Sequence, residues 1–373
     1  MIPAYVDALC KETEHVGRVA AERCIEIKAH TIFFGGGTPS LLSPPQFNSV
    51  FKSIRSAFAL TSDAEISIEA NPGTVTYEAL CQLRGMGVNR ISYGVQSANT
   101  QELHMLERAH DFFDVIEAVT SARKAGFDNL NLDLIYGLPE QKMDTWQTTV
   151  KRILDLHPEH ISAYALTLEH GTPFGRWSSR GLLPLPDPDL AAEMYEWLSE
   201  TLETNGYGQY EISNWAKQNR ECKHNIQYWR SLPYLGFGAG AHGYANGYRY
   251  SNVLRIKTYI DRITNSDSKN CKFPLSPATV NQHKQLIKDD MSEYMLNNLR
   301  LVKAGVVDAD FKSRFRSGLA VVYKKELEEL IHFGLIEQVG DVIRLTKRGR
   351  LLGNQVFIRF VDEAGQSSID VKS

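Results

Sequence analysis

Polar and glycine-rich positions follow several apolar runs of the sequence, at the point where each run ends. The positions are Gly35–Thr38, Glu69, Asn71, Gln96, Asp133 and Tyr136. Glycines let a ligand approach the backbone closely, and a carboxylate beside exposed backbone N–H groups suits an amino group or a ribose. Because the C-terminal ends of parallel strands open into one mouth of an α/β barrel, we expect these residues to gather there. Each of them could instead be a structural group with satisfied hydrogen bonds.

A second set of candidate residues lies in the stretch His224-Asn-Ile-Gln-Tyr-Trp229. An imidazole can ligate a haem iron, and aromatic rings can stack on a flat macrocycle. If the stretch is helical, His224 and Tyr228 share one face at i and i+4. Asn225 and Trp229 then share the neighbouring face. The alternative interpretation is a buried histidine packed among aromatic side chains.

Strands and helices alternate over the first 166 residues. The predicted strands are residues 31–34, 65–69, 90–95, 129–136 and 160–166, and the helices between them are 45–58, 76–86, 100–106, 112–125 and 144–156. This alternation predicts right-handed βαβ units and an α/β fold with a parallel sheet or barrel. A helix at 3–27 comes first, whereas a βα array normally opens with a strand. We therefore expect a first strand and its loop to be missing, through a gene start placed too far downstream.

The pattern divides the chain into three regions, residues 1–170, 171–280 and 281–373. The first is the predicted barrel, and the second extends it and contains the histidine–aromatic stretch. The third shows three helices and a hairpin at 335–345, an order that is typical of a small winged-helix-like domain. Such domains often bind DNA, but the basic residues here are offset by acidic ones. We therefore expect a structural lid and no nucleic-acid partner.

The composition excludes several classes of protein. The net charge of −3 gives no general attraction for nucleic acid or a membrane, although a peripheral membrane contact is left open. No apolar run approaches the roughly 20 residues of a transmembrane helix. The five cysteines are odd in number and widely spaced: Cys10, Cys24, Cys81, Cys222 and Cys271. This pattern argues against a disulfide framework and for a reducing cytoplasm.

Six motifs appear in the order that one known family uses. They are Gly35-Gly-Gly-Thr-Pro-Ser40, Glu69-Ala-Asn-Pro72, Arg90-Ile-Ser-Tyr-Gly-Val-Gln-Ser97, Asn131-Leu-Asp-Leu-Ile-Tyr-Gly-Leu-Pro139, Tyr210-Glu-Ile-Ser-Asn214 and His224-Asn-Ile-Gln-Tyr-Trp229. Together they resemble the oxygen-independent coproporphyrinogen III oxidase-like group of radical S-adenosylmethionine (SAM) proteins, and the last resembles its haem-chaperone branch. The resemblance covers nearly the whole chain. It implies a partial (β/α)6 TIM-like barrel, here without its first strand, with SAM across its mouth.

The resemblance also implies residue roles. Positions that contact the methionyl end of SAM match Gly36, Gly37 and Thr38. Further SAM-contacting positions match Glu69, Gln96, Arg108 and Asp133. In the haem-chaperone branch, haem binding is tied to the stretch that contains His224, Asn225, Tyr228 and Trp229. His224 is then the candidate ligand of the haem iron.

The sequence departs from the family pattern at one point. The family holds a [4Fe–4S] cluster in a Cys-x3-Cys-x2-Cys loop, and these 373 residues contain no such motif. Cys10 and Cys24 lack the spacing to replace it. As written, the chain cannot hold the cluster in the family manner or cleave SAM reductively.

Three functions are compatible with these observations. The preferred hypothesis is a haem-binding chaperone that inserts haem into respiratory proteins. The second is an oxygen-independent coproporphyrinogen III oxidase, which uses a SAM-derived radical for decarboxylation in porphyrin biosynthesis. The third is an unrelated α/β-barrel enzyme. The pairs Tyr228-Trp229 and Gln96-Ser97 favour the chaperone branch, whereas the sequence leaves the haem recipient and the oligomeric state open.

Overall fold

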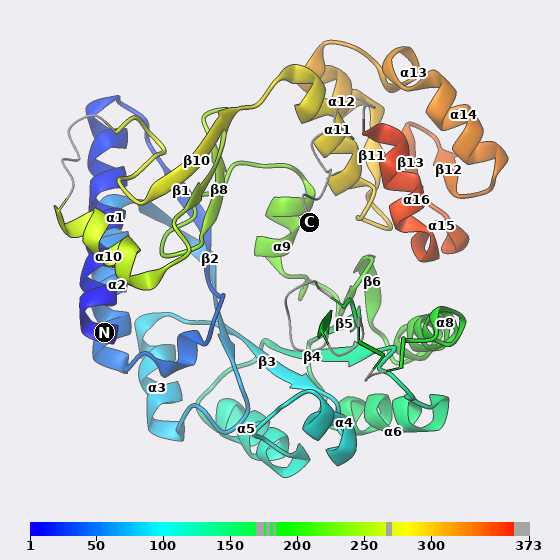
Figure 1. Ribbon diagram of the computed structural model, residues 1–373, viewed down its shortest axis with the longest axis horizontal. Helices are drawn as coiled ribbons and strands as arrows, with labels where there is room; N and C mark the ends of the chain where they lie inside the picture. The colour runs from blue at the N-terminus through cyan, green and yellow to red at the C-terminus, as the bar shows by residue number, and fades with distance from the viewer. Residues whose placement is uncertain (169–174, 177–179, 182–183, 266–270, 362–373) are drawn as a thin grey trace.

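A curled sheet with helices on its outer side forms the main body of the protein (Figure 1). The computed structural model describes residues 1–168, 175–176, 180–181, 184–265 and 271–361. Five strands are parallel and lie side by side in chain order: β1 (Lys28–Phe34), β2 (Ala59–Ala70), β3 (Arg90–Gln96), β4 (Leu130–Tyr136) and β5 (His160–Ala165). Two short antiparallel strands, β7 (Asn214–Ala216) and β6 (Gly208–Glu211), continue the sheet beyond β5. The sheet is an open half-barrel with β1 and β6 at its edges.

Local sequence signals set the bounds of the outer helices. These helices are α1 (Ile2–Glu22), α2 (Pro44–Ala57), α3 (Tyr77–Met86), α4 (Thr100–Met105), α5 (Phe112–Lys124), α6 (Met143–Leu154) and α8 (Pro188–Thr204), and a short 3-10 turn (Pro39–Leu41) follows β1. Before α2, the Ser43 backbone N–H donates to the Gln46 side chain at 2.8 Å. Asp111 accepts the backbone N–H of Phe113 and so caps α5. Gly87 takes the left-handed conformation that ends α3.

The two faces of the half-barrel differ in polarity. On the outer face, Ile66 and Ile68 of β2 share one apolar cluster with Phe47 and Phe51 of α2. Residues that alternate with the apolar ones occupy the inner face, namely Glu65, Ser67, Glu69, Arg90, Ser92, Asn131, Asp133, His160 and Ser162. Buried strands of a parallel sheet are usually apolar on both faces. The polar lining therefore marks the inner face as the functional one.

The main apolar core extends past the first predicted region. Leu198 and Leu202 of α8 and Trp215 of β7 belong to the same cluster as the outer helices. The predicted boundary at residues 170–171 lies outside the described residues. The first part of the predicted middle region thus completes the half-barrel.

The rest of the middle region forms a second sheet and two helices. Its elements are α9 (Lys223–Trp229), β8 (His242–Ala245), β9 (Tyr248–Asn252), α10 (Ile256–Asn265) and β10 (Thr279–Lys284), with the strands in the order β10-β9-β8. Glu12 of α1, which is 1% exposed, joins this region to the half-barrel. Its carboxylate accepts hydrogen bonds from Gly238 N, Asn252 Nδ2, Tyr259 Oη and Ser276 Oγ at 2.6–2.8 Å. Burial raises the pKa of Glu12, and these bonds counteract that shift.

The C-terminal region folds around its own apolar core. It contains α11 (Ile287–Asn298), β11 (Val306–Val307), α12 (Asp308–Phe315), α13 (Leu319–Val322), α14 (Lys324–His332), β12 (Ile336–Val339), β13 (Val342–Leu345), α15 (Lys347–Leu351), α16 (Gly353–Phe357) and a final 3-10 turn (Ile358–Phe360). The strands are ordered β11-β13-β12, and Met295, Phe311 and Leu330 are buried among the helices. The predicted α/β half-barrel with a small helical and hairpin domain is confirmed. The second sheet, in contrast, was absent from the sequence-based prediction.

Candidate functional site

A pocket of about 200 Å³ opens at the C-terminal ends of the parallel strands. Its lining includes five of the seven residues predicted to bind SAM: Gly37, Thr38, Glu69, Gln96 and Asp133. The sixth, Gly36, donates its backbone N–H to Glu69 Oε2 at 3.1 Å. Residues from four separate strands or their following loops thus meet at one mouth, as the strand-end pattern predicts.

The glycine loop after β1 forms an open cradle. Gly36 has a φ of +105°, which side-chain-bearing residues rarely adopt. A Cβ added at Gly36 or at Gly37 would meet no atom within 4 Å. The space beside the backbone is therefore free for a ligand.

Gln96 reaches the pocket through an irregularity at the end of β3. Its φ is +69°, and the register between β3 and β4 shifts between Tyr93 and Gln96. Such bulges re-aim a side chain, and strained backbone of this kind gathers at functional sites. A Cβ at Gly94 would lie 3.0 Å from Gln96 Nε2 and 3.1 Å from Asn71 Oδ1, so glycine there lets both amides approach the pocket.

Two carboxylates, Glu69 and Asp133, line the pocket. Burial and the nearby charge of Asp133 raise the pKa of Glu69, while the Gly36 hydrogen bond and Arg90 lower it. Asp133 accepts hydrogen bonds from Ser92 Oγ at 2.9 Å and from Asn131 Nδ2 at 2.7 Å. The pocket combines fixed acceptors with an open backbone cradle, which suits a ligand that carries an amino group and hydroxyls.

Two further candidates lie outside this lining, the strand-end residue Tyr136 and the predicted SAM contact Arg108. Tyr136 is buried on the outer face and packs against Trp146, with ring centroids 5.6 Å apart, so the expectation that it joins the mouth is wrong. Arg108 is half-buried, and its Nε has no hydrogen-bond partner among the described residues. Burial lowers its pKa.

Ser92 and Gly94 line the pocket, although sequence reasoning did not single them out. The alternation of residues along β3 contained the signal. Gln96 was already a candidate, and residues two and four positions before it share its face of a strand. The bulge before Gln96 makes this alternation of faces less regular but does not abolish it.

The predicted haem segment forms helix α9, which lies inside the half-barrel (Figure 1). His224 and Tyr228 share one face, as predicted, and His224 Nε2 lies 2.8 Å from Tyr228 Oη. The other ring nitrogen, Nδ1, lies 2.8 Å from Thr31 Oγ1 of β1. The imidazole also stacks on Phe33, with centroids 5.0 Å apart. Burial, with the charges of Arg90 and His30, lowers the pKa of His224 to about 4.

Glu65 of β2 holds the first turn of α9. Its buried carboxylate accepts the backbone N–H groups of Lys223 at 3.0 Å and His224 at 3.2 Å. An anion at a helix N-terminus satisfies N–H groups that have no partner within the helix. Glu65 thus anchors the helix that carries the haem candidates to the polar inner face.

The neighbouring face of α9 packs toward the C-terminal domain. The Trp229 ring lies 4.3 Å from the Arg300 guanidinium carbon. Arg300 follows α11 and has an ion pair with the fully buried Glu211 at 3.6 Å. Asn225 is half-buried on the same helix. Trp229 therefore contacts another part of the protein, whereas the sequence predicted a place beside haem.

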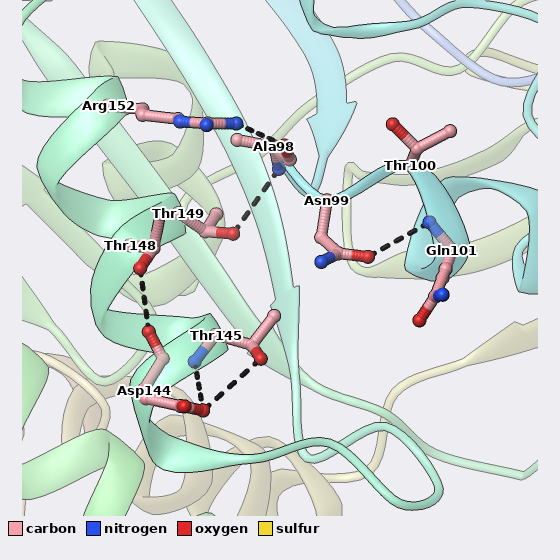
Figure 2. A pocket seen from close by; sticks show the side chains of 9 residues that line it. All are labelled: Ala98, Asn99, Thr100, Gln101, Asp144, Thr145, Thr148, Thr149 and Arg152. Atoms are coloured by element: carbon pink, nitrogen blue, oxygen red, sulfur yellow. Dashed lines mark hydrogen bonds between the residues drawn. The ribbon is translucent and has the colours of Figure 1, made fainter.

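A wider cavity of about 430 Å³ lies between α4 and α6, away from the predicted residues (Figure 2). Its lining is polar, with Asn99, Thr145 and Thr148 on its walls. Arg152 spans it, because Nη1 donates to the Ala98 carbonyl oxygen at 3.0 Å. None of the predicted SAM or haem residues lines this cavity.

The residues present do not fit an iron–sulfur cluster. Within the described part of the chain, no three His, Cys, Asp or Glu side chains gather as a metal site would require. All five cysteines are free thiols, and they are widely spaced along the chain. Cluster ligation needs several thiolates close together.

Comparisons with known proteins agree with this geometry. Residues 11–153 match the model of the radical SAM superfamily, and residues 288–352 match the HemN C-terminal domain. The heme chaperone HemW of Bacillus subtilis is 38% identical over 97% of this chain and 92% of its own length. The Escherichia coli heme chaperone HemW is 35% identical over 96% of this chain and 90% of its own length. The E. coli coproporphyrinogen III oxidase HemN has a similar structure, with a TM-score of 0.78 and 23% identity over 95% of this chain and 82% of its own.

The fold and the strand-end pocket define a protein of the radical SAM class, with the HemN-type C-terminal domain. The extent of identity to full-length relatives is more specific. The chain belongs to the HemW family of radical SAM haem chaperones. Among the described residues, none of the helices has the length and apolarity to cross a membrane.

Proposed function

We propose that this chain binds SAM in the strand-end pocket and haem beside α9, and that it acts as a haem chaperone. The observation that carries the proposal is the convergence of Gly37, Thr38, Glu69, Gln96 and Asp133 on one pocket. Membership of the HemW family supports haem as the cargo. Respiratory haem proteins are the proposed recipients, and the cytoplasm is the proposed location.

Different residues of the pocket would bind different groups of SAM. Glu69 would accept hydrogen bonds from the ammonium group of SAM. Beside it, the Gly36–Gly37 cradle would leave space for the methionyl backbone. Asp133, fixed by two donated hydrogen bonds, would accept the ribose hydroxyls. Bound SAM would supply a cationic sulfonium, which the two carboxylates favour.

His224 would contribute a neutral ligand to haem. At pH 7 its imidazole is uncharged, because its pKa is lowered to about 4, and the neutral ring is the form that binds a metal. Nδ1 faces Thr31 and Nε2 faces Tyr228. A hydrogen bond to one nitrogen orients the ring for ligation through the other. We therefore assign Nε2 to the iron, with the Tyr228 hydroxyl displaced and its ring kept as a contact.

A haem titration tests this function. Replacing His224→Ala should shift the haem absorbance band and weaken binding, while the exposed His242→Ala serves as the matched control. Circular dichroism must show that both variants keep their fold. Unchanged affinity and spectrum in a folded His224→Ala protein would refute the haem site. Isothermal titration with SAM tests the pocket separately, and conversion of coproporphyrinogen III by the protein would instead support the oxidase alternative.

A further inference from the structure

A row of buried hydrogen bonds lies on the inner face beneath the strand-end pocket. Asn131 Nδ2 donates to Asp133 Oδ1 at 2.7 Å, and Asn131 Oδ1 lies 2.6 Å from His160 Nδ1. His160 Nε2 lies 2.9 Å from Tyr210 Oη. The row crosses three strands, β4, β5 and β6. Asn131 is 2% exposed and His160 is 0% exposed, so water does not compete for these bonds.

The direction of every bond in the row is fixed by chemistry. The Asn131 NH₂ group donates to Asp133 Oδ1 and to Ser92 Oγ. The Asn131 carbonyl oxygen then faces His160, which must donate from Nδ1. Burial and Arg90 lower the pKa of His160 well below its usual value, so the ring is neutral and Nε2 is an acceptor. Tyr210 consequently donates its hydroxyl proton to Nε2.

Two further contacts make the row rigid. The second Asn131 Nδ2 proton goes to Ser92 Oγ at 2.7 Å, and Ser92 Oγ donates to Asp133 Oδ2 at 2.9 Å. Ser162 Oγ donates to Asn131 Oδ1 at 3.0 Å. Both oxygens of the Asp133 carboxylate and all hydrogen-bonding positions of the Asn131 amide are therefore engaged. The carboxylate is held in one orientation at the pocket wall.

The far end of the row lies beside Cys222, the residue that precedes the first turn of α9. Burial raises the pKa of Tyr210 well above its usual value, and the neighbouring Cys222 thiol adds to that shift. The donors of Tyr210, His160 and Asn131 all point toward Asp133. Hydrogen bonds aligned head to tail polarise one another, so the row acts as a unit.

We propose that Tyr210, His160 and Asn131 are positioning residues that orient Asp133 for the ligand in the strand-end pocket. The inference rests on the proposed SAM site and adds a set of residues that never touch the ligand. If these groups served the fold alone, each hydrogen-bonding group in the row would need only some partner. The row would not need to end at a carboxylate that lines the pocket.

The variant Tyr210→Phe tests the proposal, because it removes one donor and keeps the ring. Tyr207→Phe is the matched control: its hydroxyl is also buried and donates one bond, to the Pro158 carbonyl oxygen at 2.6 Å, outside the row. SAM affinity is measured by isothermal titration, and stability by chemical denaturation. Imidazole ¹⁵N NMR of the unaltered protein reports the tautomer of His160.

We expect both variants to lose similar stability and only Tyr210→Phe to lose SAM affinity. The loss should be about fivefold or more, the factor that one lost hydrogen bond carries. His160→Asn, which keeps a donor at the Nδ1 position, should retain more affinity than His160→Leu. Equal SAM affinity in Tyr210→Phe and Tyr207→Phe would overturn the proposal. If the unaltered protein binds no SAM, the proposed function fails, and the row is then judged by NMR alone: an Nε2–H tautomer of His160 would overturn it.

Discussion

The strand-end pocket and helix α9 hold their polar atoms in opposite ways. In the pocket, the Gly36–Gly37 cradle faces open space, and satisfied hydrogen bonds lie beneath the carboxylates. On α9, both nitrogens of His224 already have protein partners. A preorganised site needs little rearrangement when a ligand enters, so little of the binding free energy is lost. The pocket is therefore ready for its ligand, whereas α9 must exchange an internal hydrogen bond before an iron can bind.

The largest expected effect comes from breaking the anchor between the two regions. Glu65→Ala removes the acceptor of the Lys223 and His224 backbone N–H groups in the first turn of α9. Leaving a buried donor without a partner costs about 1–3 kcal/mol for each group, so we expect a loss of about 2–6 kcal/mol in the free energy of unfolding from urea denaturation. The control is Asp63→Asn, whose ion pair with Lys223 is exposed. Equal effects of the two changes would contradict the anchor.

Glu69→Gln should weaken SAM binding and stabilise the folded protein. SAM affinity should fall about tenfold or more, since a hydrogen bond to a charged group is worth roughly 1.5–3 kcal/mol. Stability should rise at pH 7. Burial and Asp133 raise the pKa of Glu69 in the folded state, so the unfolded chain loses this proton at lower pH than the folded one.

The stability gain of Glu69→Gln should therefore disappear as the pH falls below 4.5, the ordinary value for the group. Urea denaturation at pH 7 and pH 4 measures the difference, and titration calorimetry measures SAM binding. A variant that is less stable at pH 7 would show that the carboxylate serves the fold and is not held ready for a ligand.

Tyr228→Phe tests whether the internal hydrogen bond of His224 opposes haem binding at α9. The change removes the hydroxyl that faces His224 Nε2 and keeps the aromatic ring. Because the iron then displaces no hydrogen bond, haem affinity should rise about fivefold, the factor for roughly 1 kcal/mol. Thr31→Val should have the opposite effect, since Thr31 orients the ring through Nδ1. Absorbance titration with haem checks both, and a rise for Thr31→Val with a fall for Tyr228→Phe would assign Nδ1 to the iron.

The smallest effect is expected at Trp229. Trp229→Leu removes the aromatic face beneath Arg300, and a cation–π contact at a partly exposed position is worth about 0.5–1 kcal/mol. Thermal unfolding should show a small loss of stability that Trp229→Phe partly restores. Haem affinity should stay the same in both variants. A clear loss of haem binding would place Trp229 beside the macrocycle, as the sequence motif predicts.

The half-barrel could be predicted from the sequence because the alternation of strands and helices is repeated along the chain. Alternating apolar runs and helices place β1 to β5 within a few residues of their observed bounds, except that β2 begins earlier, at Ala59. The second sheet was missed, although β8 and β9 form a hairpin around Asn246-Gly247, a turn signal that the sequence carries. Its third strand has no such signal, since β10 pairs with β9 across the intervening helix α10. The strand-end rule located Glu69, Gln96 and Asp133 correctly in the pocket. It failed for Tyr136, because a side chain at a strand end points inward or outward according to its place in the alternation.

The sequence by itself determined the types of chemical group and the strands that carry them. Motif order and period-2 alternation are local properties, so the glycine cradle, the two carboxylates and the pair His224–Tyr228 could be read from the chain. Only the tertiary structure decided which partners those groups have. Thr31 and His224 lie 193 residues apart in sequence, and Arg300 reaches Trp229 from the C-terminal domain. Such contacts depend on the curvature of the sheet and on the position of α9 inside it, which no local pattern specifies.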